Sequence, residues 1–204
     1  MAKMAPGTQL VFLYLYYAEN TGSVNLTQIA KALSLSKATC TRAINDLSAS
    51  GLISQTAEGT NKWITTAYTK SELLEKAYGR LKTPVDRILY VKGTAQIEHP
   101  IASGIRALAR QSMIGVNDQD GAIAISKKEA AKIPAEDICT KQYFEDFGGA
   151  VIEVWSYDPI ILERDGCVDD ISLLLSMDND PNERVQTCLD EIRQKHGLPI
   201  KEEE

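Results

Sequence analysis

The apolar positions of residues 8–18 (TQLVFLYLYYA) surround the axis of the helix that they predict, instead of forming one stripe along it. A helix of this kind must be covered on several sides, so we expect either a core helix or half of a subunit interface. No apolar run in the chain reaches the roughly 18 residues that a membrane-spanning helix needs. We therefore expect a folded cytoplasmic protein without a membrane partner.

Two further helices are predicted directly after this segment. Asn25, with Gln28 three residues later, is typical of the capping box that begins a helix. Ser36 is suited to cap a second helix over residues 37–49, where apolar side chains recur at i, i+3, i+4 and i+7. These inward positions are Cys40, Ala43, Ile44 and Leu47. Two such helices joined by a tight turn are typical of the helix-turn-helix, whose second helix enters the major groove of DNA.

The outward face of the second helix carries side chains that suit DNA. Lys and Arg reach phosphates or guanine edges, Asn can pair with adenine, and Thr or Ala methyl groups contact thymine. The candidate DNA-binding residues here are Ser36, Lys37, Ala38, Thr39, Thr41, Arg42 and Asn45. No acid follows on this face before Asp46, whereas a merely solvated helix usually mixes both signs.

A β-hairpin is predicted next, from residues 52–56 and 62–66 around a polar turn that contains Gly59. A hairpin directly after a recognition helix is a wing. Its tip residues Thr60, Asn61 and Lys62 are candidates for contact with the sugar-phosphate backbone or the minor groove. The alternative is a hairpin that only packs, because turn residues alone do not specify contacts.

From residue 85 the pattern changes to strands that alternate with helices. Strands are predicted at residues 85–91, 122–125 and 150–157, and helices at 100–111, 127–133 and 181–195, the last capped by Asp180. The predicted fold class is α+β. We expect a winged helix-turn-helix domain at residues 1–84, followed by a small α/β sheet domain at residues 85–204 for oligomerisation, sensing or partner contact.

The charge of the chain divides at the same place. The 204 residues include 22 Lys or Arg and 28 Asp or Glu, for a net charge of -6. Residues 1–84 hold 9 basic and 5 acidic side chains, which leaves 13 basic and 23 acidic ones for the remainder. Because phosphate binding requires clustered Lys and Arg, the first part is the candidate for a polyanion, and the acidic second part would be repelled from DNA.

No catalytic or metal-binding constellation is evident, and we expect no cofactor. The four cysteines are too widely spaced for a zinc clip, and neither histidine has a metal-binding context. The nearest candidate for a metal-dependent nuclease is Glu153, but Trp155 stands where such a site would carry Lys. Trp155, Tyr157 and Tyr143 could line an apolar effector pocket, although aromatic residues beside a strand are more often core.

The string LTQIAKALSLSKATCTRAINDLSASGLI resembles the winged helix-turn-helix of MarR-type bacterial transcriptional regulators, over residues 8 to about 82. The resemblance implies DNA reading by residues 37–45 and backbone contact by the wing. Such regulators usually dimerise through long helices at both ends of the domain, whereas this chain has one medium helix that stops before Pro84. Residues 95–193, with EVWSYDP and DPNER, weakly resemble the C-terminal half of regulators related to abortive-infection antitoxins, which implies assembly or partner contact.

These observations favour a bacterial, homodimeric regulator that binds double-stranded DNA in a sequence-specific way, since one recognition helix reads too few bases alone. For the dimer surface we expect either the apolar first helix or a sheet edge around Val151 and Trp155. Two alternatives stay open. The winged helix could dock a protein instead of DNA, or the second domain could be a divergent metal-dependent nuclease that uses Glu153.

Overall fold

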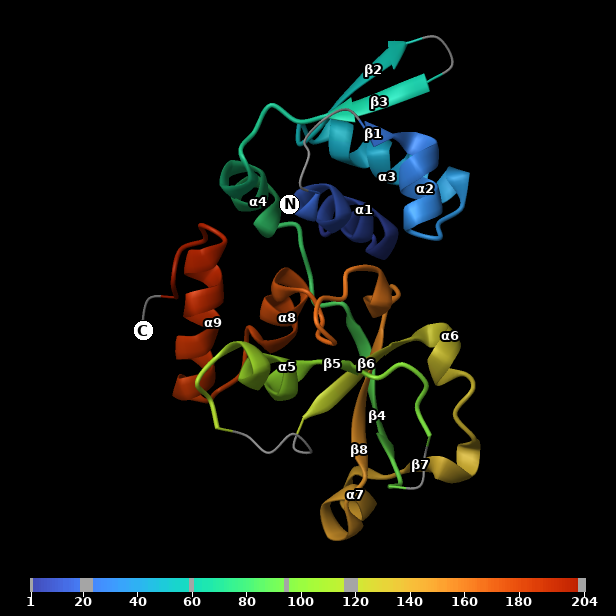
Figure 1. Cartoon of the computed structure of the whole chain (residues 1–204), viewed down its shortest axis with the longest axis vertical. Helices are drawn as coiled ribbons and strands as arrows, with labels where there is room; N and C mark the ends of the chain where they lie inside the picture. Colours follow the sequence, from blue (N-terminus) through green and yellow to red (C-terminus); the bar gives the residue numbers. More distant parts are fainter. Residues whose placement is uncertain (1, 19–23, 59–60, 94–95, 116–120, 202–204) are drawn as a thin grey trace. The chain divides into compact units, whose positions relative to one another are not determined.

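The structure is a computed structural model that describes residues 2–18, 24–58, 61–93, 96–115 and 121–201 (Figure 1). The chain is α+β, as predicted. It divides into two compact units, Met1–Lys82 with Gln194–Ile200 and Thr83–Arg193 with Lys201–Glu204. The segment Gln194–Ile200 therefore belongs to the first unit, whereas the sequence analysis places all residues after 84 in the second domain.

The first unit combines helices with a small antiparallel sheet of strand order β1-β3-β2. Its helices are α1 (Pro6–Tyr17), α2 (Leu26–Ala32), α3 (Lys37–Ala49) and α4 (Lys70–Tyr78). Its strands are β1 (Val24–Asn25), β2 (Ser54–Glu58) and β3 (Asn61–Thr65). The order of two helices followed by a hairpin is that of the predicted winged helix-turn-helix.

Local signals explain where these helices begin and end. The Asn25 side chain accepts the N–H of Thr27 and Gln28 completes the capping box of α2. The Ser36 hydroxyl accepts the N–H of Thr39 and begins α3. After α3, Gly51 adopts a φ of 73°, which glycine reaches without a steric penalty. The predicted helix boundaries in this region are therefore confirmed.

Helix α1 is a core helix of the first unit. Phe12, Leu13 and Tyr16 are buried, and α1 packs against α3 and α4. The Gln9 side chain is also buried, and it bonds both the N–H and the C=O of Lys82, which satisfies its amide inside the unit. Much of α1 is thus packed within the unit, as the core-helix interpretation predicts, whereas Tyr14, Leu15 and Tyr17 are half-buried. The alternative of a subunit interface on α1 stays a prediction.

The second unit is built on a five-stranded sheet of order β5-β6-β8-β4-β7, in which only the β6–β8 pair is parallel. The strands are β4 (Val85–Val91), β5 (Ile101–Ala102), β6 (Ala122–Ser126), β7 (Ile138–Cys139) and β8 (Ala150–Trp155). The helices are α5 (Gly104–Gln111), α6 (Lys127–Ala130), α7 (Lys141–Phe147), α8 (Asp170–Met177) and α9 (Glu183–Lys195), with single turns at Ala135–Asp137 and Pro159–Ile161.

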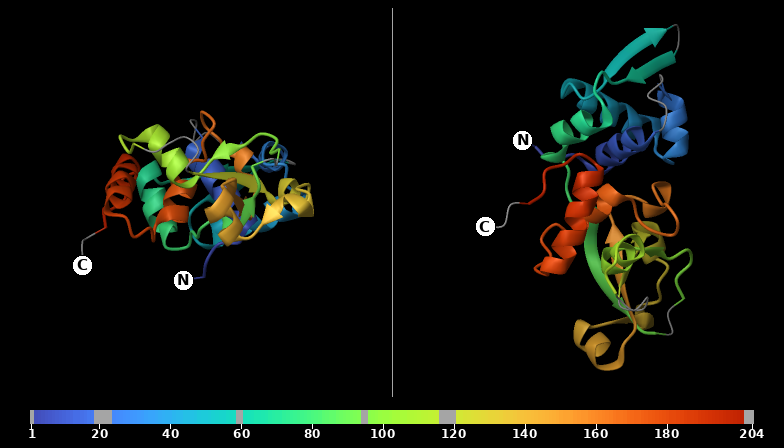
Figure 2. Two further views of the ribbon diagram at one scale, coloured as in Figure 1. Left: turned by 90° about the horizontal axis from the view of Figure 1, so that it is seen from below. Right: turned by 60° about the vertical axis from the view of Figure 1, so that its left-hand side comes forward.

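The two faces of this sheet are covered differently. One face holds a core cluster in which Val91, Ile152 and Ile125 meet Ala130 of α6. The opposite face carries Glu153 and Trp155, and α5, α8 and α9 lie on that side (Figure 2). Strand β8 lies in the middle of the sheet, between β6 and β4. The expectation of a sheet edge near Val151 and Trp155 is therefore wrong.

Two predicted helix starts are also wrong. Ile101 and Ala102 form β5 instead of helix, because the backbone of Ala102 bonds Gly166 and Val168, and α5 begins only after Ser103. Helix α9 begins at Glu183, and the side chain of Asn182, not Asp180, accepts the N–H of Arg184. In the first case partners far away in the chain decide the start, and in the second case the local cap by Asn182 does.

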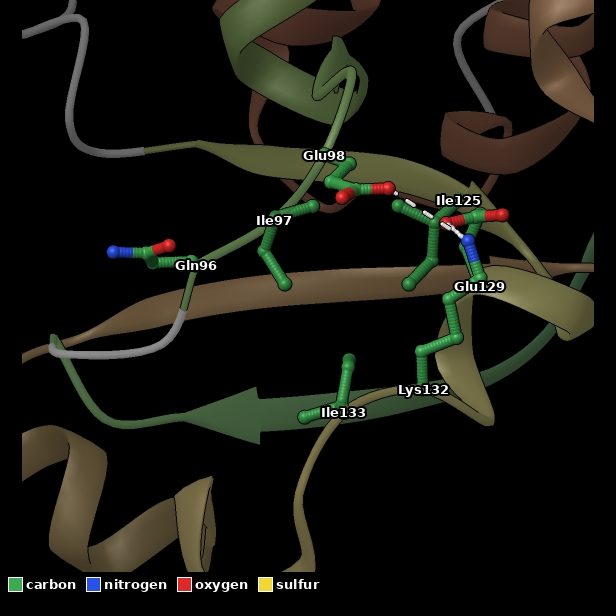
Figure 3. A pocket seen from close by; sticks show the side chains of 7 residues that line it. All are labelled: Gln96, Ile97, Glu98, Ile125, Glu129, Lys132 and Ile133. Atoms are coloured by element: carbon green, nitrogen blue, oxygen red, sulfur yellow. Dashed lines mark hydrogen bonds and ion pairs between the residues drawn. The ribbon is translucent and has the colours of Figure 1, made fainter.

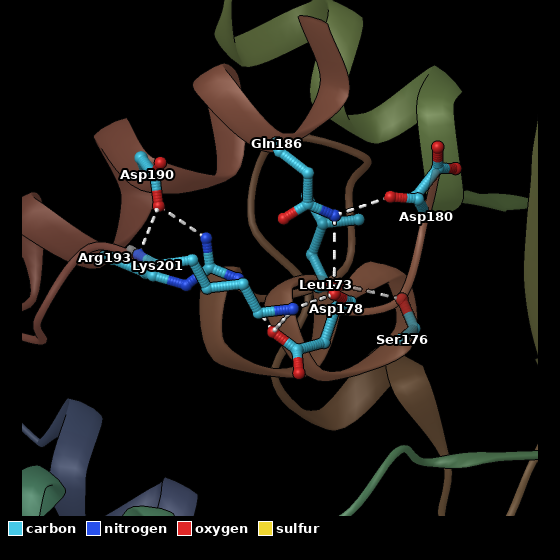
Figure 4. Close-up of polar contacts among 8 residues, drawn as sticks. All are labelled: Leu173, Ser176, Asp178, Asp180, Gln186, Asp190, Arg193 and Lys201. Atoms are coloured by element: carbon cyan, nitrogen blue, oxygen red, sulfur yellow. Dashed lines mark hydrogen bonds and ion pairs between the residues drawn. The ribbon is translucent and has the colours of Figure 1, made fainter. Parts of the chain in front are cut away.

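A buried arginine joins α9 to the end of α8 (Figure 4). Arg193 donates to the carboxylates of Asp190 at 2.6 Å and Asp178 at 2.7 Å. At the other end of α9, the Gln186 side chain donates to the backbone oxygens of Asp178 and Asp180. These contacts hold α8, the connecting turn and α9 together as one piece of the second unit.

Candidate nucleic-acid interface

The turn between α2 and α3 has a defined backbone. Ser34 adopts a φ of 51°, and the N–H of Leu35 donates to the carbonyl of Ala30 at 3.0 Å. This conformation closes α2 and lets Ser36 cap α3 two residues later. The buried stripe of Cys40, Ala43, Ile44 and Leu47 then turns the opposite face of α3 to solvent.

The structure places most of the candidate residues on that solvent face. Ser36, Lys37, Ala38, Arg42 and Asn45 are exposed, and Thr41 is half-buried. Thr39 differs from them: its hydroxyl lies 2.9 Å from the hydroxyl of Ser36, and its methyl group faces Gly7 of α1. The contacts of Thr39 therefore stabilise the start of α3 and its packing on α1.

The acid that ends this face is neutralised within the unit. Arg80 follows α4 and donates to both carboxylate oxygens of Asp46, at 3.0 and 3.2 Å. The Arg80 side chain is 13% exposed and Asp46 is 43% exposed. Sequence reasoning missed Arg80, because nothing near Asp46 in the chain indicates a partner 34 residues away.

A second residue that the sequence analysis missed joins the face from the hairpin. The Gln55 side-chain amide, on β2, donates to the Asn45 carbonyl oxygen at 3.3 Å. Because this bond occupies one acceptor position of Asn45, it orients the Asn45 amide group. Only the register of the hairpin on α3 brings the two side chains together.

The predicted hairpin is present as β2 and β3, with Lys62 opposite Ala57 and Asn61 opposite Glu58. Asn61 and Lys62 therefore begin β3, directly after the turn. The remaining tip residue, Thr60, lies outside the described residues.

The comparison with protein families gives a match in the helix-turn-helix and hairpin region of the first unit. Residues 8–62 match the model of the MarR family. The match begins within α1 and ends within β3, so it covers the helix-turn-helix and the hairpin of this MarR-like region. The proteins of that family are DNA-binding regulators of transcription and not enzymes, and the N-terminal region of this chain is similar to them. No curated protein and no solved structure matches the chain.

The match does not extend into the second unit. The likeness of residues 95–193 to antitoxin-related regulators therefore stays a prediction. In the part of the chain that the structure describes, no helix is long and apolar enough to cross a membrane.

Glu153, the candidate for a nuclease site, is buried. Trp155 donates its indole N–H to the Glu153 carboxyl at 3.0 Å, and burial raises the pKa of Glu153 above its ordinary value. A metal ion needs ionised carboxylates, whereas this environment favours the protonated acid. Within the described ranges, no group of three or more His, Cys, Asp or Glu side chains could hold a metal ion.

The aromatic residues proposed for an effector pocket do not meet. Trp155 and Tyr157 are buried and pack edge to face at 5.8 Å, whereas Tyr143 lies on exposed α7 against Phe147. That hypothesis is therefore wrong, because two of the three rings are core.

A pocket of about 240 Å³ lies elsewhere in the second unit (Figure 3). Its apolar side chains are Ile97, Ile125 and Ile133. At its rim, the Lys132 ammonium lies 2.9 Å from Glu129 and 3.7 Å from Glu98. The charges of this rim are thus already paired with one another.

Proposed function

We propose that the protein is a sequence-specific regulator of transcription that binds double-stranded DNA as a homodimer. Residues 37–45 of α3 would enter the major groove, and residues 58–62 of the wing would follow the backbone. The observation that supports this most is the solvent face of α3, which exposes Lys37, Arg42 and Asn45 while Arg80 neutralises Asp46.

A dimer follows from the reach of one recognition helix. A single helix reads too few bases for specificity, and paired helices contact half-sites about one turn, or roughly 34 Å, apart. The acidic second unit would supply the contact between copies, since its charge keeps it away from phosphates. We propose no enzymatic activity, and a regulator that binds bacterial DNA would work in the cytoplasm.

The test is binding to random double-stranded DNA over a series of salt concentrations. We expect affinity to fall steeply with salt, and Lys37→Ala and Arg42→Ala each to reduce the slope of log affinity against log salt by about 0.9. Lys128→Ala is the matched control, because Lys128 is an exposed lysine on α6 of the second unit. Its slope should equal that of the wild type.

Two results would contradict the proposal. Absence of binding at low salt, where even non-specific contacts are measurable, would indicate that the winged helix docks a protein. Magnesium-dependent cleavage of the DNA that Glu153→Gln abolishes would indicate a nuclease.

A further inference from the structure

One edge of the sheet in the second unit is open. Strand β8 pairs with β4 along its length, but β7 pairs only with Tyr90 and Val91. In the described part of the chain, the outer edge of residues 86–89 therefore has no strand partner. Unpaired N–H and C=O groups along a strand edge are ready to bond another strand.

The opposite edge of the same sheet is covered. The N–H of Ala102 in β5 donates to Gly166 at 2.8 Å, and the N–H of Val168 donates to Ala102 at 2.9 Å. The segment that holds Gly166 and Val168 thus takes the place of a further strand. Apart from the outer side of the two-residue strand β7, the open edge of β4 is the one available for pairing among the described strands of this sheet.

Apolar side chains accompany the open edge. Ile88 is 42% exposed, and Tyr90, two residues on and therefore on the same face, packs against Phe144 of α7 at 5.4 Å. Phe147 and Tyr143 are also exposed on α7 and pack on each other at 4.8 Å. An apolar strand edge beside exposed aromatic rings is typical of a contact surface.

We propose that residues 87–89 of β4 pair in antiparallel fashion with the same residues of a second copy of the chain. This interface rests on the proposed function, which needs two copies for two half-sites. Ile88 is the middle of the stretch, because β7 occupies the edge at Tyr90 and a bulge interrupts the strand between Val85 and Arg87. Two-fold symmetry then places Ile88 against Ile88 of the second copy, and Arg87 against Leu89.

The local charge favours a second copy. Arg87 lies 3.4 Å from Asp86, and Lys127 lies 2.7 Å from the same carboxylate, so the charges at this end of β4 largely cancel. The second unit is acidic as a whole, and two copies meet here with little repulsion because the charges around this edge are paired. In the proposed register, Arg87 does not lie opposite Arg87 of the second copy, and Asp86 does not lie opposite Asp86. No like charges are therefore directly opposed across the interface.

The register is tested by cross-linking. Opposed residues of antiparallel strands have Cα atoms about 4.5–5.5 Å apart, which a disulfide can span. Under mild oxidation, Ile88→Cys should form a disulfide-linked dimer at least about tenfold faster than Ile160→Cys. Ile160 is a matched control, because it is 51% exposed and lies on the turn Pro159–Ile161. The wild type gives the background from the native cysteines.

The energetics are tested by sedimentation. The wild type should be a dimer, and Ile88→Lys should raise the dimer dissociation constant about 100-fold, because two lysines would face each other where two isoleucines packed. Ile160→Lys should leave the constant unchanged. Circular dichroism of both variants checks that they fold, and the cross-linking rate of Ile88→Cys does not depend on that outcome.

The results separate this interface from the proposed function. A wild type that is monomeric, or a dimer that Ile88→Lys does not weaken, would overturn the interface, even if Arg42-dependent DNA binding persists. Equal cross-linking rates for Ile88→Cys and Ile160→Cys would do the same. A dimer that Ile88→Lys dissociates but that binds no DNA would keep the interface and overturn the regulator.

Discussion

Replacing Arg80 by methionine removes the cation that neutralises Asp46, while the methionine keeps most of the packing of the stem. Removing one partner of a fully buried ion pair costs about 3–5 kcal/mol, and an exposed pair contributes about 0–1 kcal/mol. Arg80 is 13% exposed and Asp46 is 43% exposed, so water would solvate much of the carboxylate that is left. We therefore expect Arg80→Met to lower the free energy of unfolding of the first unit by about 1.5 kcal/mol, or about 6–12 °C in Tm.

The assay is a double-mutant cycle of Arg80→Met and Asp46→Asn. Urea unfolding is followed by the fluorescence of Trp63, which belongs to the first unit, in a constant Trp155→Phe background that leaves one tryptophan. We expect a coupling free energy of about 1 kcal/mol between the two positions. A coupling below about 0.3 kcal/mol would refute the reasoning, because the two side chains would then act independently.

The four proteins of this double-mutant cycle also test the DNA-binding face of α3. Without Arg80, Asp46 presents an uncompensated negative charge at the end of the α3 face, and DNA affinity should fall by about tenfold. Asp46→Asn in the Arg80→Met background should restore most of that affinity. If the double variant binds as weakly as Arg80→Met, then the charge of Asp46 is not the cause.

Three further changes test the second unit. Burial raises the pKa of Glu153 above its ordinary value of 4.5. The folded protein therefore keeps a proton that the unfolded chain releases, and the free energy of unfolding falls as the pH rises from the unfolded pKa through the folded one. Glu153→Gln should remove this fall in thermal melts recorded between about pH 4 and 8. Arg193→Met should cost about 2–3 kcal/mol in urea unfolding, because the carboxylates of Asp178 and Asp190 lose the buried guanidinium, although Lys201 stays 3.2 Å from Asp178. A Cβ at Gly149 would lie 2.1 Å from the carbonyl of Val91, so Gly149→Ala should cost about 3 kcal/mol, whereas Gly148→Ala, with open space, should cost about 1 kcal/mol in the same assay.

The helix-turn-helix was readable from sequence because its signals are local. The caps at Asn25 and Ser36 act on N–H groups within one turn, and the stripe from Cys40 to Leu47 reflects the period of a single helix. The same holds for β4, whose predicted bounds are those observed. Interactions between residues within about four positions produce sequence patterns from which the structure can be predicted.

The fold of the second unit was harder to predict, because it depends on contacts between residues that are distant in the chain. The run VIEVW predicts a strand but does not say which strands flank it, and β8 lies between a parallel and an antiparallel neighbour far away in the chain. Residues 101–102 carry a helical pattern, yet their backbone bonds Gly166 and Val168. Strand order is decided by pairings over long loops, which leave no periodic signal.

The sequence by itself determined the helices of the first unit, the solvent face of α3 and the division of charge along the chain, because periodicity, capping and composition are properties of neighbouring residues. Only the tertiary structure decided that Arg80 neutralises Asp46, that Gln55 orients Asn45 and that β7 leaves most of the outer edge of β4 unpaired. Each of these depends on residues that folding brings together from distant positions. Their contact is a product of packing and strand pairing, and no local pattern encodes it.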